Sequence, residues 1–149
     1  MSKSADIAAA VAARIETIRT ANGYATEIGV RVYRGRRKID EGHLPCAVIV
    51  EGDDEVPDMR EGSTQAKIRQ PFIIEGHTDC DPDNPNDAAH AIVADIKRAI
   101  FSGDLTLGGL TRSAVRYAGR SIAPREDGLS IVSAAVEISI EFVEELAQP

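Results

Sequence analysis

The sequence predicts an α+β domain in which two helices cover one face of a mostly antiparallel sheet of about five strands. Residues 131–142 alternate between apolar and other side chains over an unusually long run, which predicts a long C-terminal strand. Residues 4–22 and 84–103 carry apolar side chains at helical spacing. The other apolar runs are short and are bounded by turn-forming residues. We therefore expect the element order α-β-β-β-α-β-β in a single domain formed by residues 1–149.

The C-terminal strand is the element around which the predicted sheet is arranged. At about 3.3 Å per residue it would be roughly 40 Å long, about twice the usual length of a strand. One face carries Glu137, Ser139 and Glu141, which favours an antiparallel sheet whose second face meets water or a partner. We expect these three residues to belong to a protein interface. The opposite, buried face is expected to consist of Val132, Ala134, Val136, Ile138, Ile140 and Phe142.

The first third of the chain predicts one helix and two strands. The helix is expected to begin after Ser4, which can cap it, and to end at Asn22-Gly23. Residues 28–33 alternate and predict a strand with one apolar face, whereas residues 44–50 are apolar on both alternations and predict a strand covered on both faces. The buried stripe of the helix is expected to be Ile7, Val11, Ile15 and Ile18.

A long polar connection and a third strand follow. Residues 52–65 are rich in polar and turn-forming side chains, and a loop of this length tends to be functional or disordered. Residues 66–75 alternate again between apolar and polar side chains. Because Pro71 cannot donate to a strand ladder, we expect this strand to lie at an edge of the sheet or to be bulged.

The last part of the chain predicts a helix and a hairpin. Asn84 is expected to cap the helix, with Pro85 in the first helical position. Residues 115–122 predict a fourth strand, and a turn at residues 124–128 joins it to the long C-terminal strand. The buried stripe of this helix is expected to be Ala89, Val93, Ile96 and Ile100.

Composition and charge argue against several classes of function. The net charge of −7 and the isoelectric point near 4.9 would repel nucleic acid, so a dedicated DNA or RNA binder is not expected. DNA could still pass through an acidic channel without binding to it. No apolar run approaches the ~18 residues of a membrane-spanning helix, so we expect no membrane association. Cys46 and Cys80 do not form a disulfide framework, which favours a reduced, intracellular setting.

A local exception to the acidic charge lies after the first predicted strand. We call Arg34, Arg36, Arg37 and Lys38 the basic segment. It has no interleaved aromatic side chains and is followed by acidic residues, which argues against nucleic-acid binding. We expect it to contact an acidic protein surface, because such a local excess of charge on a surface is typical of a steered protein contact.

Residues 77–87 are the stretch richest in chemically reactive side chains. Asp79, Asp81 and Asp83 are spaced like the start of a calcium loop. The sixth position of such a loop is Asn84 instead of glycine, and the twelfth is His90 instead of glutamate. A calcium site is therefore not expected, and a polar loop that ends in a helix cap accounts for the pattern.

The same stretch and the rest of the chain predict no other chemistry. A structural zinc site needs four ligands in short pairs, and His77 and Cys80 have only distant possible partners. The chain contains no nucleophile elbow, phosphate loop or dinucleotide fingerprint. We therefore expect no catalytic residue, no metal ligand, no cofactor-binding residue and no enzymatic activity.

Seven short motifs are spread over nearly the whole chain. They are Arg31-Val-Tyr-Arg-Gly-Arg-Arg37, Leu44-Pro45, Glu51-Gly-Asp-Asp-Glu55, Asp87-Ala-Ala-His-Ala-Ile92, Leu107-Gly-Gly-Leu110, Tyr117-Ala-Gly-Arg120 and Val136-Glu-Ile-Ser-Ile-Glu-Phe-Val143. In this order, and with the predicted elements, the chain resembles the tail terminator proteins of long-tailed, lambda-like siphophages.

This resemblance implies a structural virion protein that assembles as a ring, usually a hexamer, on the last ring of the tail tube. There it would stop tube polymerisation and form the surface that joins the head. The implied partners are the tail tube protein and a head–tail connector protein, and the implied location is the head-proximal end of the tail after assembly in the host cytoplasm. Another connector, stopper or tail completion protein would share the size and ring symmetry. A small metal-dependent enzyme that uses His77 is the alternative from a different class.

Overall fold

The computed structural model describes residues 2–35, 38–123 and 130–149. Within these ranges the chain forms two α-helices, α1 (Lys3–Ile15) and α2 (Pro85–Phe101). Short 3-10 helices occupy Thr20–Asn22, Ile28–Val30 and Glu41–His43. The strands of the single sheet are β1 (Val32–Arg34), β2 (Cys46–Glu51), β3 (Glu55–Met59), β4 (Gln65–Asp79), β5 (Arg116–Ile122) and β6 (Ile131–Glu145).

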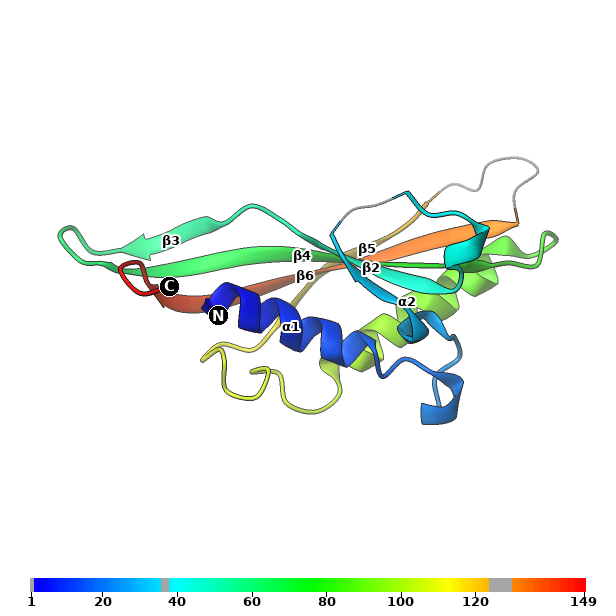
Figure 1. The fold of residues 1–149 in the computed structure, drawn as a ribbon, viewed down its shortest axis with the longest axis horizontal. Helices are drawn as coiled ribbons and strands as arrows, with labels where there is room; N and C mark the ends of the chain where they lie inside the picture. The colour runs from blue at the N-terminus through cyan, green and yellow to red at the C-terminus, as the bar shows by residue number, and fades with distance from the viewer. Residues whose placement is uncertain (1, 36–37, 124–129) are drawn as a thin grey trace.

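The sheet has the strand order β1-β2-β4-β6-β5, and β3 also pairs with β4 (Figure 1). β1 runs parallel to β2, and every other described strand pair is antiparallel. The predicted α+β class, the mostly antiparallel sheet and the long C-terminal strand are therefore confirmed. The predicted turn at residues 124–128 lies outside the described residues.

β4 and β6 form the spine of the sheet. Each is 15 residues long, and they pair along their whole length from Gln65 opposite Glu145 to Asp79 opposite Ile131. Such a ribbon is longer than the helical layer, so one end of it projects past the N-terminus of α1 (Figure 1). The lengths of these two strands thus determine the elongated shape of the molecule.

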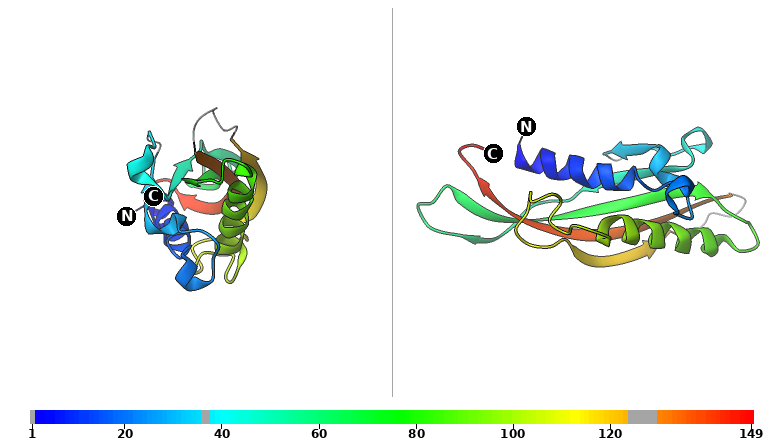
Figure 2. Two further views of the ribbon diagram at one scale, coloured as in Figure 1. Left: turned by 90° about the vertical axis from the view of Figure 1, so that its right-hand side faces the viewer. Right: turned by 90° about the horizontal axis from the view of Figure 1, so that it is seen from below.

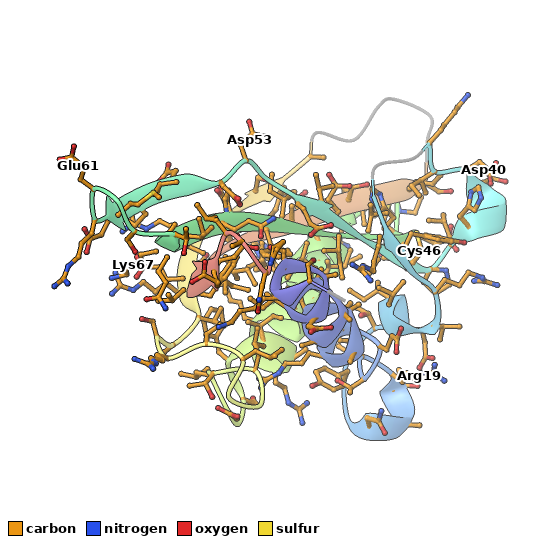
Figure 3. The ribbon with its side chains drawn as sticks, turned by 60° about the vertical axis from the view of Figure 1, so that its left-hand side comes forward. Arg19, Asp40, Cys46, Asp53, Glu61 and Lys67 are labelled. Carbon is orange, nitrogen blue, oxygen red and sulfur yellow. The ribbon has the colours of Figure 1, made fainter. Side chains whose placement is uncertain are left out.

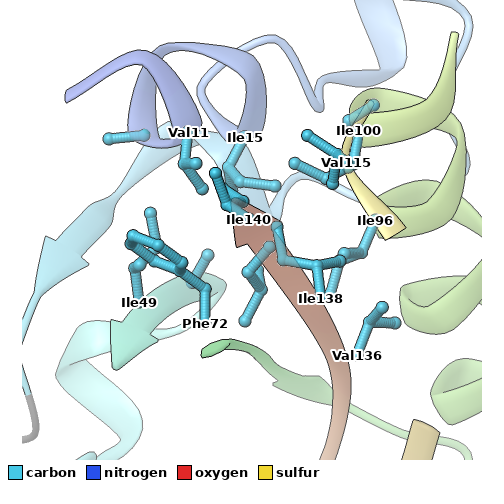
Figure 4. Close-up of a cluster of buried hydrophobic side chains, with 14 of the residues drawn as sticks. Val11, Ile15, Ile49, Phe72, Ile96, Ile100, Val115, Val136, Ile138 and Ile140 are labelled. Atoms are coloured by element: carbon cyan, nitrogen blue, oxygen red, sulfur yellow. The ribbon is translucent and has the colours of Figure 1, made fainter. Parts of the chain in front are cut away.

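The two helices lie on one face of the sheet, as expected (Figure 2). We call this the helix face and the opposite side the outer face. The apolar row of β6 is buried on the helix face, where Val136, Ile138 and Ile140 pack with residues of both helices (Figure 4). Fully burying a side chain of this size stabilises the fold by about 1.5–3 kcal/mol, so this layer is the main source of stability. Cys46 is also fully buried, which fits the strand covered on both faces that is predicted for residues 44–50.

The first helix is shorter than the sequence suggested. α1 ends at Ile15 instead of continuing to Asn22-Gly23, and Ser2 caps its start in place of the expected Ser4, which lies inside the helix. After Ile15 the chain tightens, because the Ile18 N–H donates to the carbonyl of Ile15, three residues earlier, at 3.0 Å. Ile18 is nevertheless buried, so its predicted role in the apolar stripe is confirmed without the helix.

The first strand is also shorter than expected. The Gly29 N–H donates to the carbonyl of Ile18 at 2.9 Å, which draws this segment against the end of α1. Residues 28–30 therefore form a 3-10 helix, and the strand is confined to Val32–Arg34. Of the alternating apolar residues, Ile28 is buried in this tight turn, whereas Val30 is exposed.

Two expectations for the centre of the chain are wrong. Residues 52–65 contain the strand β3 and are not a plain loop. Pro71 lies in the middle of β4, a central strand, and not in an edge strand. The proline is tolerated because β2 has ended and β3 has not yet begun opposite it, and its carbonyl accepts from the Gly52 N–H at 2.8 Å.

α2 begins with Pro85, as predicted, but its cap differs from the expectation. Asn84 occupies the N-cap position, yet its side chain makes no capping hydrogen bond. Instead, the Asp87 N–H donates to the Asn84 backbone carbonyl at 3.2 Å. In the described part of the chain, neither α1 nor α2 is long and apolar enough to cross a membrane.

Candidate interaction surface

The end of the sheet that projects beyond the helices is the main candidate surface. We define the arm as β3, residues 60–69, which include the start of β4, and residues 141–146, which include the end of β6. In the arm β4 is the middle strand, with β3 on one side and β6 on the other. β5 reaches along β6 only as far as Ser139. Among the described residues, the outer edges of β3 and of this part of β6 therefore have no strand partner.

A network of charged side chains crosses the outer face of the arm. Arg69 of β4 donates to the Glu141 carboxylate of β6 through Nε at 2.9 Å and through a terminal nitrogen at 2.8 Å. Its other terminal nitrogen lies 3.5 Å from the Glu55 carboxylate of β3. Lys67 adds a second cation 3.4 Å from Glu141. The network therefore joins all three strands of the arm. Both hydrogen bonds from Arg69 end on the same oxygen of Glu141, and such charge-assisted hydrogen bonds are stronger than those between neutral groups.

The network changes the ionisation of its buried member. Glu141 is only 8% exposed, and its hydrogen bonds from Arg69 hold the pKa of its carboxyl below the usual range, with a further contribution from Lys67. Hydrogen bonds to Glu141 also raise the pKa of Arg69. Because the folded pKa of Glu141 lies below the unfolded value of about 4.3, the network stabilises the fold above that pH. The stabilisation is lost as the pH falls through the folded pKa.

The Glu141→Gln variant is expected to lose about 1 kcal/mol at pH 7, because the neutral amide cannot replace the charged acceptor between two partly exposed cations. The difference from the unmodified protein should shrink as the pH falls from about 4.3 through the lower folded pKa, since Glu141 becomes protonated in both states of the original chain only below the folded pKa. Thermal unfolding at several pH values measures it. Glu137→Gln, an exposed residue on the same face of β6, is the control, and equal losses in both variants would contradict the role of the network.

The structure separates the interface residues expected from the sequence. Arg34 and Lys38 are exposed at the β1 side of the sheet, whereas Arg36 and Arg37 lie outside the described residues. Glu137 is exposed and Ser139 is half-buried, both on the outer face of β6. Arg34 aligns through β2 and β4 with Val136, so three strand spacings, about 14 Å, separate it from the Glu137 region.

Glu141 differs from the other predicted interface residues because it is already paired within the chain. A partner that reached this part of the surface would meet the partly exposed side chains of Lys67 and Arg69 before it met the carboxylate. The strand periodicity of the sequence places Glu141 on the outer face correctly. It carries no information on which residue of β4 lies opposite, and the ion pair depends on that register.

His77 lies in a polar cluster of its own on the outer face. Its Nδ1 is 2.6 Å from the Ser133 hydroxyl, and its Nε2 is 3.4 Å from the Glu75 carboxylate. This order of groups resembles a nucleophile, a base and an orienting acid. Ser133 is, however, part of a paired strand, and its carbonyl accepts from Ala123. A nucleophilic serine needs N–H donors near its hydroxyl to bind the oxyanion that forms during the reaction. The strand N–H groups around Ser133 lie in the plane of the sheet and do not point into the space above the Ser133 hydroxyl.

The acidic stretch after β4 forms a local turn. The Asp83 N–H donates to the Asp81 carboxylate at 3.0 Å, and both side chains are exposed. The two ring nitrogens of His77 contact Ser133 and Glu75 instead of these aspartates. Among residues 2–35, 38–123 and 130–149, no group of three or more His, Cys, Asp or Glu side chains is placed to hold a metal ion.

The arm carries exposed apolar side chains that were not predicted from the sequence. Val56 and Met59 project from β3, and Val143 and Leu146 project from the end of β6. Val56 is hidden in the sequence by the polar residues around it, and Val143 continues the β6 run on its polar side. The sequence does contain a sign of the exposed apolar pair on β6, because Val143 is an apolar residue at a position that continues the polar row of Ser139 and Glu141.

Comparison of the sequence with models of known protein families finds no match, and comparison with curated proteins finds none either.

Proposed function

We propose that this protein is the tail terminator of a long-tailed phage, a structural protein that forms a ring on the end of the tail tube, stops its polymerisation and provides the surface that joins the head. The sequence motifs that resemble this family support the proposal. The observation that carries it in three dimensions is the arm, a three-stranded projection that extends past the helical layer and whose two edges have no strand partner in the described part of the chain.

The surface features favour assembly over catalysis. Exposed strand edges are pairing sites that monomeric proteins normally cover or shorten. The arm also carries most of the large exposed apolar side chains of the described chain. The net charge of −7 suits a ring through which DNA passes without being retained. The partners in this proposal are other copies of the chain, the tail tube protein and a head–tail connector.

The test is to mix the purified protein with tail tubes that lack a terminator. Light scattering of the protein alone, over a range of concentrations, should give a multiple of the subunit mass of 16.0 kDa. Electron microscopy of the mixture should show tubes with one closed end and a constant length. Unlimited tube growth in the presence of the protein would overturn the proposed function.

A neighbouring virion role and an enzymatic role give different outcomes in the same assays. A connector or stopper would form a ring but bind the head or an already terminated tail instead of the bare tube. A metal-dependent enzyme that uses His77 would be monomeric and would retain stoichiometric metal, which the His77→Ala variant would lose.

Reversal of charge in the basic segment is expected to weaken capping. Arg34 and Lys38 are exposed at the β1 side of the sheet and on this proposal face an acidic protein surface. The Arg34→Glu, Lys38→Glu variant should cap fewer tubes at a given concentration, with at least a fivefold higher concentration needed for half-capping. Retention on immobilised DNA should stay low for both proteins.

The Arg116→Glu, Arg120→Glu variant is the control for net charge, because both residues are exposed on β5, at the opposite end of the sheet from β1 and the basic segment. Normal capping by the Arg34 and Lys38 variant would contradict the predicted contact. Tight binding of the unmodified protein to DNA would also contradict it, and such binding would weaken with salt at a slope of about −0.9 per neutralised phosphate.

A further inference from the structure

We infer that the two free edges of the arm are the two halves of a head-to-tail contact between copies of this chain, in which the β3 edge of one copy lies along the β6 edge of the next. The inference deepens the ring described under the proposed function and rests on it. It names the surfaces by which neighbouring subunits bind each other, and the occupant of each edge is a second copy of the chain.

The backbone at the β6 edge of the arm faces outward, away from β4. Lys3 of α1 donates to the Val143 carbonyl at 3.0 Å, so this carbonyl points away from β4 and toward the free edge. Beside it lies a cleft of about 360 Å³, whose lining includes Lys3, Val143 and Arg112. Lys3 already occupies this carbonyl, so a partner strand would have to displace it, whereas the cleft is open to side chains of a second copy.

The β3 edge has a restricted capacity to pair. All five residues of β3 are exposed, and Pro57 in its centre has no N–H to donate. Backbone pairing with another strand is thus limited to either side of Pro57, and the rest of the contact is made by side chains. The proline also prevents β3 from acting as an unbroken template for uncontrolled strand addition.

The β3 edge and the cleft beside the β6 edge carry opposite net charge. Residues 53–61 contain five carboxylates and one guanidinium, and Figure 3 shows Asp53 and Glu61 pointing away from the ribbon. The cleft is lined by three cations, Lys3, Lys67 and Arg112, and by one carboxylate, Glu141, which is already paired with Lys67 and Arg69. Contact of a β3 edge with this cleft is therefore attractive, whereas contact of two β3 edges brings like charges together.

Both edges also carry exposed apolar side chains that a contact would cover. On β3, Val56 is 54% and Met59 is 47% exposed. At the β6 edge, Val143 is 45% and Leu146 is 47% exposed. Apolar area removed from water contributes about 25 cal/mol per Å². The apolar residues therefore stabilise the contact between copies, and the charges determine which edge pairs with which.

The contact of a β3 edge with a β6 edge determines the symmetry of the assembly. A contact between two different surfaces of the same chain is heterologous, and it closes into a ring when the rotation between neighbours is a simple fraction of a turn. β3 and β6 are both antiparallel to β4 and so run parallel to each other. A rotation axis along the strands preserves their direction, so the contact between neighbouring copies is parallel.

Two charge-reversed variants test the contact. The acidic-edge variant carries Asp58→Lys and Glu61→Lys, and the basic-edge variant carries Lys3→Glu and Arg112→Glu. Each alone is expected to raise the concentration for half-assembly at least tenfold, because like charges then meet at every contact. An equimolar mixture should recover the assembled mass in light scattering, since subunits that alternate around an even-numbered ring restore opposite charges at every contact. Unfolding temperatures of the single proteins check that both variants are folded.

The apolar part of the contact has its own variant and control. Met59→Asp is expected to reduce assembly, whereas Val30→Asp places the same change at a residue that is 43% exposed but outside the arm, and should have little effect. Equal assembly of the unmodified protein and both charge variants would overturn the inference. So would a mixture that fails to recover, or an unmodified protein that stays at 16.0 kDa at every concentration and on tail tubes.

Capping of tail tubes separates this inference from the proposed function. If the unmodified protein forms a ring that the charge variants break, but the ring never caps tubes, the contact stands and the tail function is wrong. If the unmodified protein and both single variants cap tubes equally well, the tail function stands and the contact is wrong.

Discussion

The Gly29→Ala variant is expected to lose about 2 to 3 kcal/mol of unfolding free energy, because an added methyl group overpacks a site lined by backbone. Gly29 is buried in the 3-10 helix that follows α1. A Cβ atom there would lie 2.5 Å from the carbonyl oxygen of Ile15 and 2.6 Å from that of Ile18. Backbone atoms cannot rotate away as a flexible side chain can, so the segment must move off the end of α1.

Gly42→Ala is the matched control for this prediction. Gly42 also lies in a 3-10 helix, but a Cβ there would meet only the exposed Asp40 carboxylate oxygen, at 3.2 Å, which needs to shift by only a few tenths of an ångström and can keep its hydrogen bond from the Gly42 N–H. We expect a loss of about 0.5 kcal/mol or less, as for surface substitutions in general. Urea unfolding of both variants at one fixed protein concentration measures the difference. Equal losses would show that the close approach at Gly29 is not what limits substitution.

The close approach at Gly29 illustrates why the first strand was mispredicted. Ile28 and Val30 alternate with glycine and arginine as the residues of a half-buried strand do. In the structure Ile28 is buried in the core, Val30 is exposed, and the turn is held by the Gly29 hydrogen bond to Ile18. Alternation over so few residues cannot distinguish a strand from a tight turn, because the deciding contact is made with another element.

The long strand was predictable because its apolar residues alternate strictly over a run too long for a turn. Six alternate apolar residues of β6 are all nearly or completely buried, and this pattern fits a strand and no other regular element. β3 was not predictable for the opposite reason. Each of its residues is exposed, so no apolar period marks it, and Pro57 in its centre argues against a strand. It exists because the unpaired edge of β4 beyond β2 accepts it.

The candidate surface was predictable only in part. The outer face of β6 could be located from the sequence, since the polar positions alternate with the buried ones. The arm could not, because it depends on where β5 stops along β6 and on which residues of β3, β4 and β6 come together. Glu141 and Arg69 are 72 residues apart in the chain, and only the strand register brings them within hydrogen-bonding distance.

Asp95 is a further residue that the sequence interpretation missed, because it stands inside a helix whose other buried positions are apolar. It is 5% exposed on α2, and its carboxylate accepts hydrogen bonds from the backbone N–H groups of Ala25 and Thr26 at 3.2 and 2.7 Å. The Thr26 hydroxyl donates a third, at 2.7 Å. Asp95 thereby fixes the segment that leads into β1 and the basic segment.

The Asp95→Ala variant is expected to lose about 2 to 3 kcal/mol of unfolding free energy, because the partly buried donors of Ala25 and Thr26 then have no charged acceptor. Asp95→Asn should lose less, about 1 to 2 kcal/mol, since one oxygen remains to accept but the amide nitrogen then faces donors. Asp87→Asn is the control, because Asp87 is exposed in the first turn of the same helix and should contribute about 0.5 kcal/mol through the helix dipole. Hydrogen exchange of residues 24–31 should rise in the Asp95 variants and not in the control. Unchanged exchange there, or a loss at Asp95 no larger than at Asp87, would show that this carboxylate does not anchor the segment.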